Sequence, residues 1–111
     1  MFAAAGTDGY EDVLPGVRRR TLCHGRETLL TEFRLSEGHE LPRHEHPHEQ
    51  TGYLVSGRLR FTIGDETRDV GPGDSWCILS GVTHGAVVLE DAVAVEAFSP
   101  VREDFLPARE D

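Results

Sequence analysis

The stretch HEHPHEQ, residues 44–50, places three of the six histidines of the chain within five positions and ends in a glutamine. In an extended strand, side chains two positions apart point to the same side, so His44, His46 and, if the strand continues, Gln50 share one face. Two imidazoles at this spacing can bind one divalent metal ion, and a third donor a few residues later can complete one face of its coordination sphere. We therefore expect a metal site on a β-platform.

A further ligand must come from another part of the chain. His84 follows a turn and begins the apolar stretch HGAVVLE (84–90), which makes it the natural partner of the cluster. His48 has the same spacing but follows a proline, where strand geometry is least secure, so it carries little weight as a ligand. His39 is expected in a turn. The alternative is that these histidines line an exposed acidic loop and bind nothing.

Patterns of period two elsewhere in the chain predict an all-β fold. Apolar and polar residues alternate in TEFRLS (31–36) and in RLRFTIG (58–64), as they do in half-buried strands. Further β-branched runs lie at 53–55, 86–89 and 92–98, and the turn signals between the runs include Gly57, GPGD (71–74) and ED (90–91). We expect PGV (15–17) to lead into the first strand. Short strands at this spacing indicate an antiparallel sandwich or barrel with little helix.

The size and composition of the chain are those of a globular protein. Its 111 residues predict a single domain, 1–111, with less ordered ends at about 1–12 and 103–111. No apolar run approaches the roughly 18 residues that cross a bilayer, and no basic leader precedes an apolar segment. We therefore expect no membrane span and no signal peptide, and the cytoplasm is the default location.

The charges and the cysteines exclude two further kinds of protein. The net charge of −9 repels phosphate backbones, and the one basic run, 18–20, is too short to bind nucleic acid against it. The two cysteines, Cys23 and Cys77, are too few for a disulfide framework. A nucleic-acid partner is therefore not expected.

Two motifs together resemble those of the cupin superfamily. The first runs glycine, five residues, H-x-H, a short gap, glutamate, six residues and glycine; the matching residues are Gly38, His44, His46, Gln50 and Gly57, with glutamine in place of glutamate. The second runs glycine, five residues, P-x-G, two residues, histidine, three residues and asparagine; the matching residues are Gly73, Leu79, Gly81, His84 and Val88, with leucine for proline and valine for asparagine. The resemblance implies a double-stranded β-helix, a small jelly-roll barrel that holds a metal ion inside.

Within that superfamily, residues 46–66 and the tail EAFSPVREDFL (96–106) are similar to small cupins of pectin and alginate breakdown. Those enzymes convert a 4,5-unsaturated monouronate into its linear keto form. The similarity implies catalytic groups at Glu96 and Arg102, and a homodimer. The metal ligands that it implies are His44, His46, Gln50 and His84. The family pattern has aspartate at the acidic position, so Glu96 is a departure that lengthens the side chain by one methylene.

The expected roles of the two catalytic candidates follow from their chemistry. Glu96 would move a proton if burial brought its pKa towards neutrality. Arg102 would hold a substrate carboxylate through two parallel hydrogen bonds, to which a planar guanidinium is suited. Each has a plain alternative: Glu96 would be an outward polar residue of a terminal strand, and Arg102 would pair with Glu103 or Asp104.

The glutamine at position 50 bears on the function. Three neutral imidazoles and an amide leave a divalent ion its full charge, so the site would favour an anionic ligand. The metal itself stays open among zinc, nickel, iron, manganese and copper. The leading hypothesis is metal-assisted isomerisation or ring opening of an acidic sugar derivative. The alternatives are a cupin dioxygenase of a small organic substrate and a non-catalytic module in which the metal presents a ligand.

Overall fold

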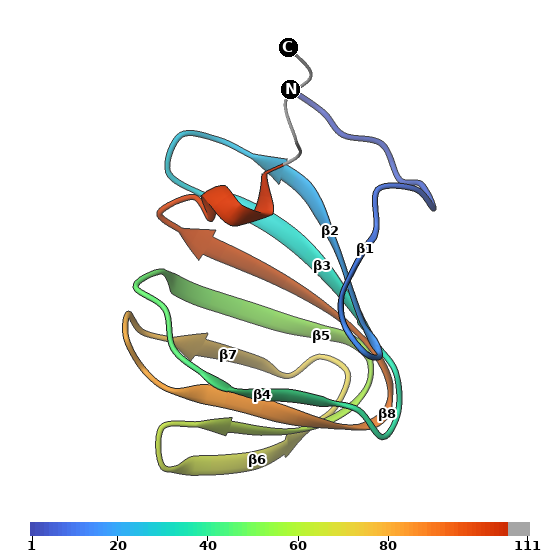
Figure 1. Ribbon diagram of the computed structural model, residues 1–111, viewed down its shortest axis with the longest axis vertical. Coiled ribbons are helices and arrows are strands. Elements are labelled where there is room, and N and C mark those ends of the chain that lie inside the picture. Colours follow the sequence, from blue (N-terminus) through green and yellow to red (C-terminus); the bar gives the residue numbers. More distant parts are fainter. Residues whose placement is uncertain (107–111) are drawn as a thin grey trace.

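The computed structural model describes residues 1–106, which form eight strands and one short 3-10 helix (Figure 1). The strands are β1 (Glu11–Leu14), β2 (Val17–His24), β3 (Leu29–Leu35), β4 (Glu40–His44), β5 (Glu49–Ile63), β6 (Glu66–Val70), β7 (Ser75–Ile78) and β8 (His84–Ser99), and the helix is η1 (Glu103–Phe105). The expected all-β class is confirmed. Within these residues no helix is long and apolar enough to cross a membrane. Of the end expected to be less ordered, 107–111 lie outside the described residues.

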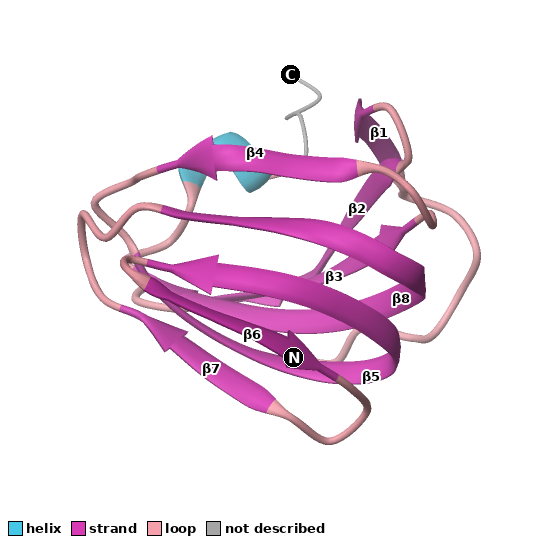
Figure 2. Ribbon diagram, turned by 90° about the horizontal axis from the view of Figure 1, so that it is seen from below, coloured by secondary structure: helices cyan, strands magenta, loops and turns pink. Residues whose placement is uncertain are grey.

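The long strands β5 and β8 join the two halves of the barrel, because each takes part in both. The C-terminal part of β8 pairs with β3 and with the beginning of β5, whereas its N-terminal part pairs with β4 and with the end of β5. On the other side of β5, β7 pairs with its beginning and β6 with its end. All of these pairs are antiparallel, and the strands wrap around a common interior, with β4 and β7 on opposite sides (Figure 2).

Two of the expected turns are bends inside these long strands, so the prediction that they separate strands is wrong. Gly57 lies within β5 and has a φ of +86°, and residues 90–91 lie within β8. A Cβ atom at Gly57 would lie 2.2 Å from the carbonyl oxygen of Asp91, so only glycine fits there. The register between β5 and β8 shifts on both sides of Gly57. These irregularities let both strands bend together from one half of the barrel to the other.

The first strand begins earlier than expected. PGV (15–17) does not lead into the first strand but connects β1 to β2 in a hairpin, in which Leu14 pairs with Val17. Gly16 at the turn has a φ of +72°, which a glycine adopts without strain. The pairing places β1 at the edge of the sheet beside β2.

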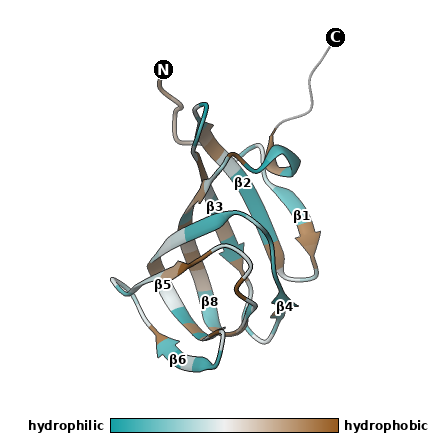
Figure 3. Cartoon of the chain, turned by 90° about the vertical axis from the view of Figure 1, so that its left-hand side faces the viewer, coloured by the Kyte–Doolittle hydropathy of each residue, from teal (hydrophilic) through white to brown (hydrophobic). Residues whose placement is uncertain are grey.

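Apolar side chains on the inner faces of the strands form the core. Hydrophobic and hydrophilic residues follow one another along the strands (Figure 3), as the period of two predicts. The main cluster is Val17, Leu35, Leu54, Leu59, Phe61, Val70, Ile78, Ala86, Val88, Ala92 and Ala94. A smaller cluster contains Leu29, Phe98 and Phe105, of which Phe105 comes from η1. The hydroxyl of Thr21 on β2 donates a hydrogen bond to the carbonyl of Phe105 and fastens η1 against the barrel.

Candidate metal centre

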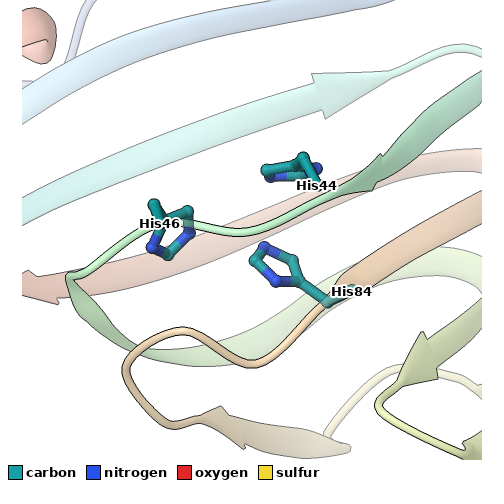
Figure 4. Close-up of side chains that lie close together, drawn as sticks. All are labelled: His44, His46 and His84. Carbon is teal, nitrogen blue, oxygen red and sulfur yellow. The ribbon is translucent and has the colours of Figure 1, made fainter.

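Strand pairing brings three histidines together at one end of β4 and β8. His44 ends β4 and lies opposite His84, which begins β8, and His46 follows two residues after His44 (Figure 4). One nitrogen from each ring lies within 4.8 Å of the others. The ring centroids of His44 and His84 are 4.2 Å apart, and those of His46 and His84 are 4.9 Å apart. This three-histidine cluster could hold a metal ion, as the H-x-H spacing predicted.

The backbone fixes the orientation of the three rings in the same way. Each Nδ1 atom lies 2.7 to 2.9 Å from a carbonyl oxygen two residues away in the chain; the carbonyls are those of Pro42, His48 and Val82. Because a carbonyl oxygen only accepts, Nδ1 carries the proton in the neutral ring and donates it. The lone pair is therefore on Nε2, which is the arrangement that orients histidines as metal ligands.

Burial keeps the rings of His46 and His84 neutral. The pKa of His84 is lowered to about 4, chiefly by burial and to a smaller extent by the nearby His44, His46 and Arg102. Burial also lowers the pKa of His46, with an additional contribution from the charge of Arg102. A neutral ring is the form that binds a metal. At neutral pH the metal therefore does not have to compete with a proton for these two nitrogens.

Gln50 lies beside the cluster, on the second residue of β5. Its side chain is buried, its Oε1 atom is 3.0 Å from Nε2 of His46, and its amide nitrogen donates a hydrogen bond to the carboxyl group of Glu96. The bond to Glu96 directs the amide nitrogen away from the histidines and leaves the amide oxygen facing them. The structure thus places the predicted fourth donor next to the triad.

Glu96 points inward from β8 and is 6% exposed, so the alternative of an outward polar residue does not describe it. Burial raises the pKa of its carboxyl group to about 7. The indole N–H of Trp76 lies close enough to limit this rise without making a hydrogen bond, and Gln50 limits it as well. Gly52 permits this arrangement, because it pairs with both residues and a Cβ on it would lie 2.3 Å from the indole.

Arg102 lies just before η1 and reaches the same cavity. Its Nε and Nη2 atoms donate hydrogen bonds of 3.1 and 2.8 Å to the two carboxylate oxygens of Asp104. Its guanidinium carbon lies 4.1 Å from the ring centroid of Phe105 and 5.1 Å from that of Phe98. The edge of the guanidinium that was expected to hold a substrate carboxylate is therefore occupied by Asp104 in this structure.

These groups line one cavity of about 330 Å³, whose other walls are mainly apolar. This is the size of a pocket for a small molecule. Arg19 on β2 also lines it, a residue that stood out in the sequence only as part of the basic run 18–20. The period of β2 could have identified it, because Arg19 alternates with Val17, which is buried in the core.

The remaining histidines do not join the cluster. His48 lies beside His46, with ring centroids 5.8 Å apart, but is not among the residues whose ligand atoms converge. His24 and His39 are exposed to solvent. Within residues 1–106, the candidate metal cluster consists of His44, His46 and His84.

The fold and this cluster define a class of protein. Residues 31–99 match the cupin domain family, and the chain belongs to it. The chain is 28% identical over 99 residues to the pectin degradation protein KdgF of Dickeya dadantii (strain 3937). The aligned residues cover 87% of this chain and 90% of the relative.

Solved structures agree with this assignment. KdgF from Halomonas sp. is 31% identical, with a TM-score of 0.90 over 96% of this chain and 98% of that chain. An RmlC-like cupin from Shewanella frigidimarina NCIMB 400 is 30% identical, with a TM-score of 0.90 over 95% of each chain. The double-stranded β-helix and the similarity to cupins of pectin breakdown are thus confirmed. The expected homodimer and the cytoplasmic location stay predictions.

Proposed function

We propose that this protein is a metal-dependent cupin that opens the ring of a 4,5-unsaturated uronate. The observation that carries the proposal is the meeting of four uncharged donors and one buried carboxyl group in a cavity of sugar size. The similarity to KdgF, a pectin degradation protein, supports an acidic sugar as the substrate.

The residues present fit a metal ion. Nε2 of His46 and Oε1 of Gln50 both present lone pairs, so the 3.0 Å between them is not a hydrogen bond of the neutral groups. A cation shared by the two atoms would replace their repulsion by attraction. The ion would be a divalent transition metal, namely zinc, nickel, iron, manganese or copper, held by His44, His46, Gln50 and His84.

The charge of the ligands supports an anionic substrate. None of the four donors is a carboxylate, so a bound ion would keep its full positive charge and could act as a Lewis acid and as a template for the substrate. The guanidinium groups of Arg19 and Arg102 line the same cavity. Both features favour a small acid over a neutral sugar.

Glu96 is suited to the proton transfers of the reaction. Ring opening removes the proton of the anomeric hydroxyl, breaks the bond between the anomeric carbon and the ring oxygen, and adds a proton to the alkene carbon. The reaction is an isomerisation, so one carboxyl group can accept the first proton and supply the second. A pKa of about 7 lets Glu96 do both near neutral pH. Arg102 would stabilise the negative charge that develops on the substrate.

The proposal is tested by combining metal analysis with turnover. We expect purified protein to contain a transition metal that is lost in His46→Ala, and to remove the ultraviolet absorbance of an unsaturated monouronate. Glu96→Gln and Arg102→Ala should abolish turnover and keep the metal, whereas Glu49→Gln, on the exposed face of β5, should leave both unchanged. Normal turnover in Glu96→Gln and Arg102→Ala would refute the mechanism. Ligand retention without turnover would indicate a binding module instead.

A further inference from the structure

Two arginines meet at one ring on the wall of the cavity. The guanidinium carbon of Arg19 lies 3.8 Å from the ring centroid of Phe105, and that of Arg102 lies 4.1 Å from the same centroid. The two carbons can therefore be no more than about 8 Å apart. Both side chains are only 15% exposed. A pair of nearly buried cations at this distance needs anions nearby.

The carboxylates near this pair of arginines bind Arg102 more closely than Arg19. Asp104 binds two nitrogens of Arg102, as described above. Within residues 1–106, Arg19 has one side-chain hydrogen-bond and ion-pair partner, the carboxylate of Glu11, at 3.4 Å, and Asp104 acts on it through its charge alone. The carboxylate of Glu11 is 68% exposed, and an exposed ion pair of this length contributes little. Most N–H groups of Arg19 are thus available to a ligand.

The fold holds the guanidinium group of Arg19 in a fixed position. This residue lies on β2, between Val17 and Thr21 on the same face, and Thr21 is hydrogen-bonded to the carbonyl of Phe105. The ring of Phe105 is 8% exposed and packs against Leu29 and Phe98. The guanidinium therefore rests on a rigid aromatic surface, and η1 and β2 lie side by side (Figure 1). Little side-chain freedom remains to be lost on binding.

We propose that Arg19 is the residue that binds the carboxylate of the substrate and thereby selects acidic over neutral ligands. This inference rests on the proposed function for the identity of the sugar. The ligand would be a small carboxylic acid with oxygens that face the histidines at one end of the cavity and a carboxylate at Arg19. Phe98 and Phe105 line the wall between these two ends, because Phe98 contacts both His46 and Phe105. The planar guanidinium would bind the carboxylate through two parallel hydrogen bonds.

Arg19→Met tests the proposal, with Arg18→Met as the matched control. Arg18 is the next residue on β2, points outward and pairs with Asp12 on the surface. With the unsaturated monouronate as substrate, Arg19→Met should raise KM roughly 10- to 100-fold, the loss expected for charge-assisted hydrogen bonds, and change kcat less than about threefold. Arg18→Met should match the wild type. An unchanged KM in Arg19→Met, with active wild-type protein, overturns the role of Arg19 and leaves the proposed function intact.

A wild type without turnover would refute the proposed function alone. In that case a binding experiment tests the role of Arg19. Calorimetry with D-galacturonate and D-galactose should show that the wild type prefers the acid and that Arg19→Met loses this preference. Equal binding of both sugars by the wild type, or an unchanged preference in Arg19→Met, overturns the inference. Arg19→Lys, which keeps the charge and loses the planar fork, covers the case in which the methionine variant does not fold. It should bind the acid more weakly than the wild type, and binding equal to that of the wild type overturns the proposed geometry.

Discussion

The buried carboxyl group of Glu96 should make the metal-free protein less stable as the pH rises. The pKa of this group is raised from 4.5 to about 7 by burial. Below pH 4.5 it is protonated in both the folded and the unfolded chain, so it does not change the free energy of unfolding. Between pH 4.5 and about 7 the unfolded chain releases the proton while the folded chain keeps it, so the free energy of unfolding falls. Above pH 7 both forms release the proton, and the free energy of unfolding falls no further because of this group.

The size of this effect follows from the two pKa values. Each pH unit between them corresponds to about 1.4 kcal/mol, so the free energy of unfolding should fall by about 3 kcal/mol between pH 4.5 and pH 8 because of this group alone. Glu96→Gln has nearly the same shape, can still accept the hydrogen bond of Gln50, and cannot ionise. The variant should therefore be more stable than the wild type above pH 7, and the advantage should vanish at low pH.

Urea unfolding of metal-free protein at several pH values measures this difference. Chelator-treated wild type and Glu96→Gln are compared at each pH, because the other titrating groups are common to both and cancel. Glu49→Gln, at the exposed end of β5, serves as the control for removal of a carboxylate and should show no such trend. A difference between wild type and Glu96→Gln that stays constant from pH 5 to pH 8 would show that Glu96 does not carry a buried, shifted proton.

Three further predictions concern the metal and the packing beside it. His84→Ala should lose the metal, as measured by elemental analysis, whereas His24→Ala, at an exposed position away from the cluster, should keep it. Gly52→Ala should lower the free energy of unfolding by roughly 1–3 kcal/mol, because the added Cβ would lie 2.3 Å from an indole ring; Gly25→Ala, with no atom within 4 Å of the new Cβ, should be nearly neutral in chemical denaturation. Gln50→Glu should retain metal more tightly on dialysis against a chelator and bind D-galacturonate more weakly, since the added negative charge cancels part of the charge of the ion; an equal affinity for the acid would contradict the argument from ligand charge.

Several features of this protein could be predicted from the sequence because they depend on local geometry. The period of two in a strand is a property of the backbone, so it indicated an all-β fold and placed His44 and His46 on one face before any contact was known. The spacing of Gln50 after the histidines, and the turn before His84, added two donors at positions that the pairing of β4, β5 and β8 brings together. The resemblance to the cupin motifs then implied the double-stranded β-helix.

The tertiary structure decided what depends on contacts between distant segments. Glu96 has a raised pKa because other strands cover it, and the pattern of β8 alone left open whether it faces solvent. Arg19 belongs to the cavity because η1, more than eighty residues later, folds back against β2. By contrast, the pairing of Arg102 with Asp104 is a local contact between residues two positions apart, which the sequence had offered as an alternative. Desolvation and charge pairing depend on which groups surround a side chain, and that surrounding exists only once the barrel has closed.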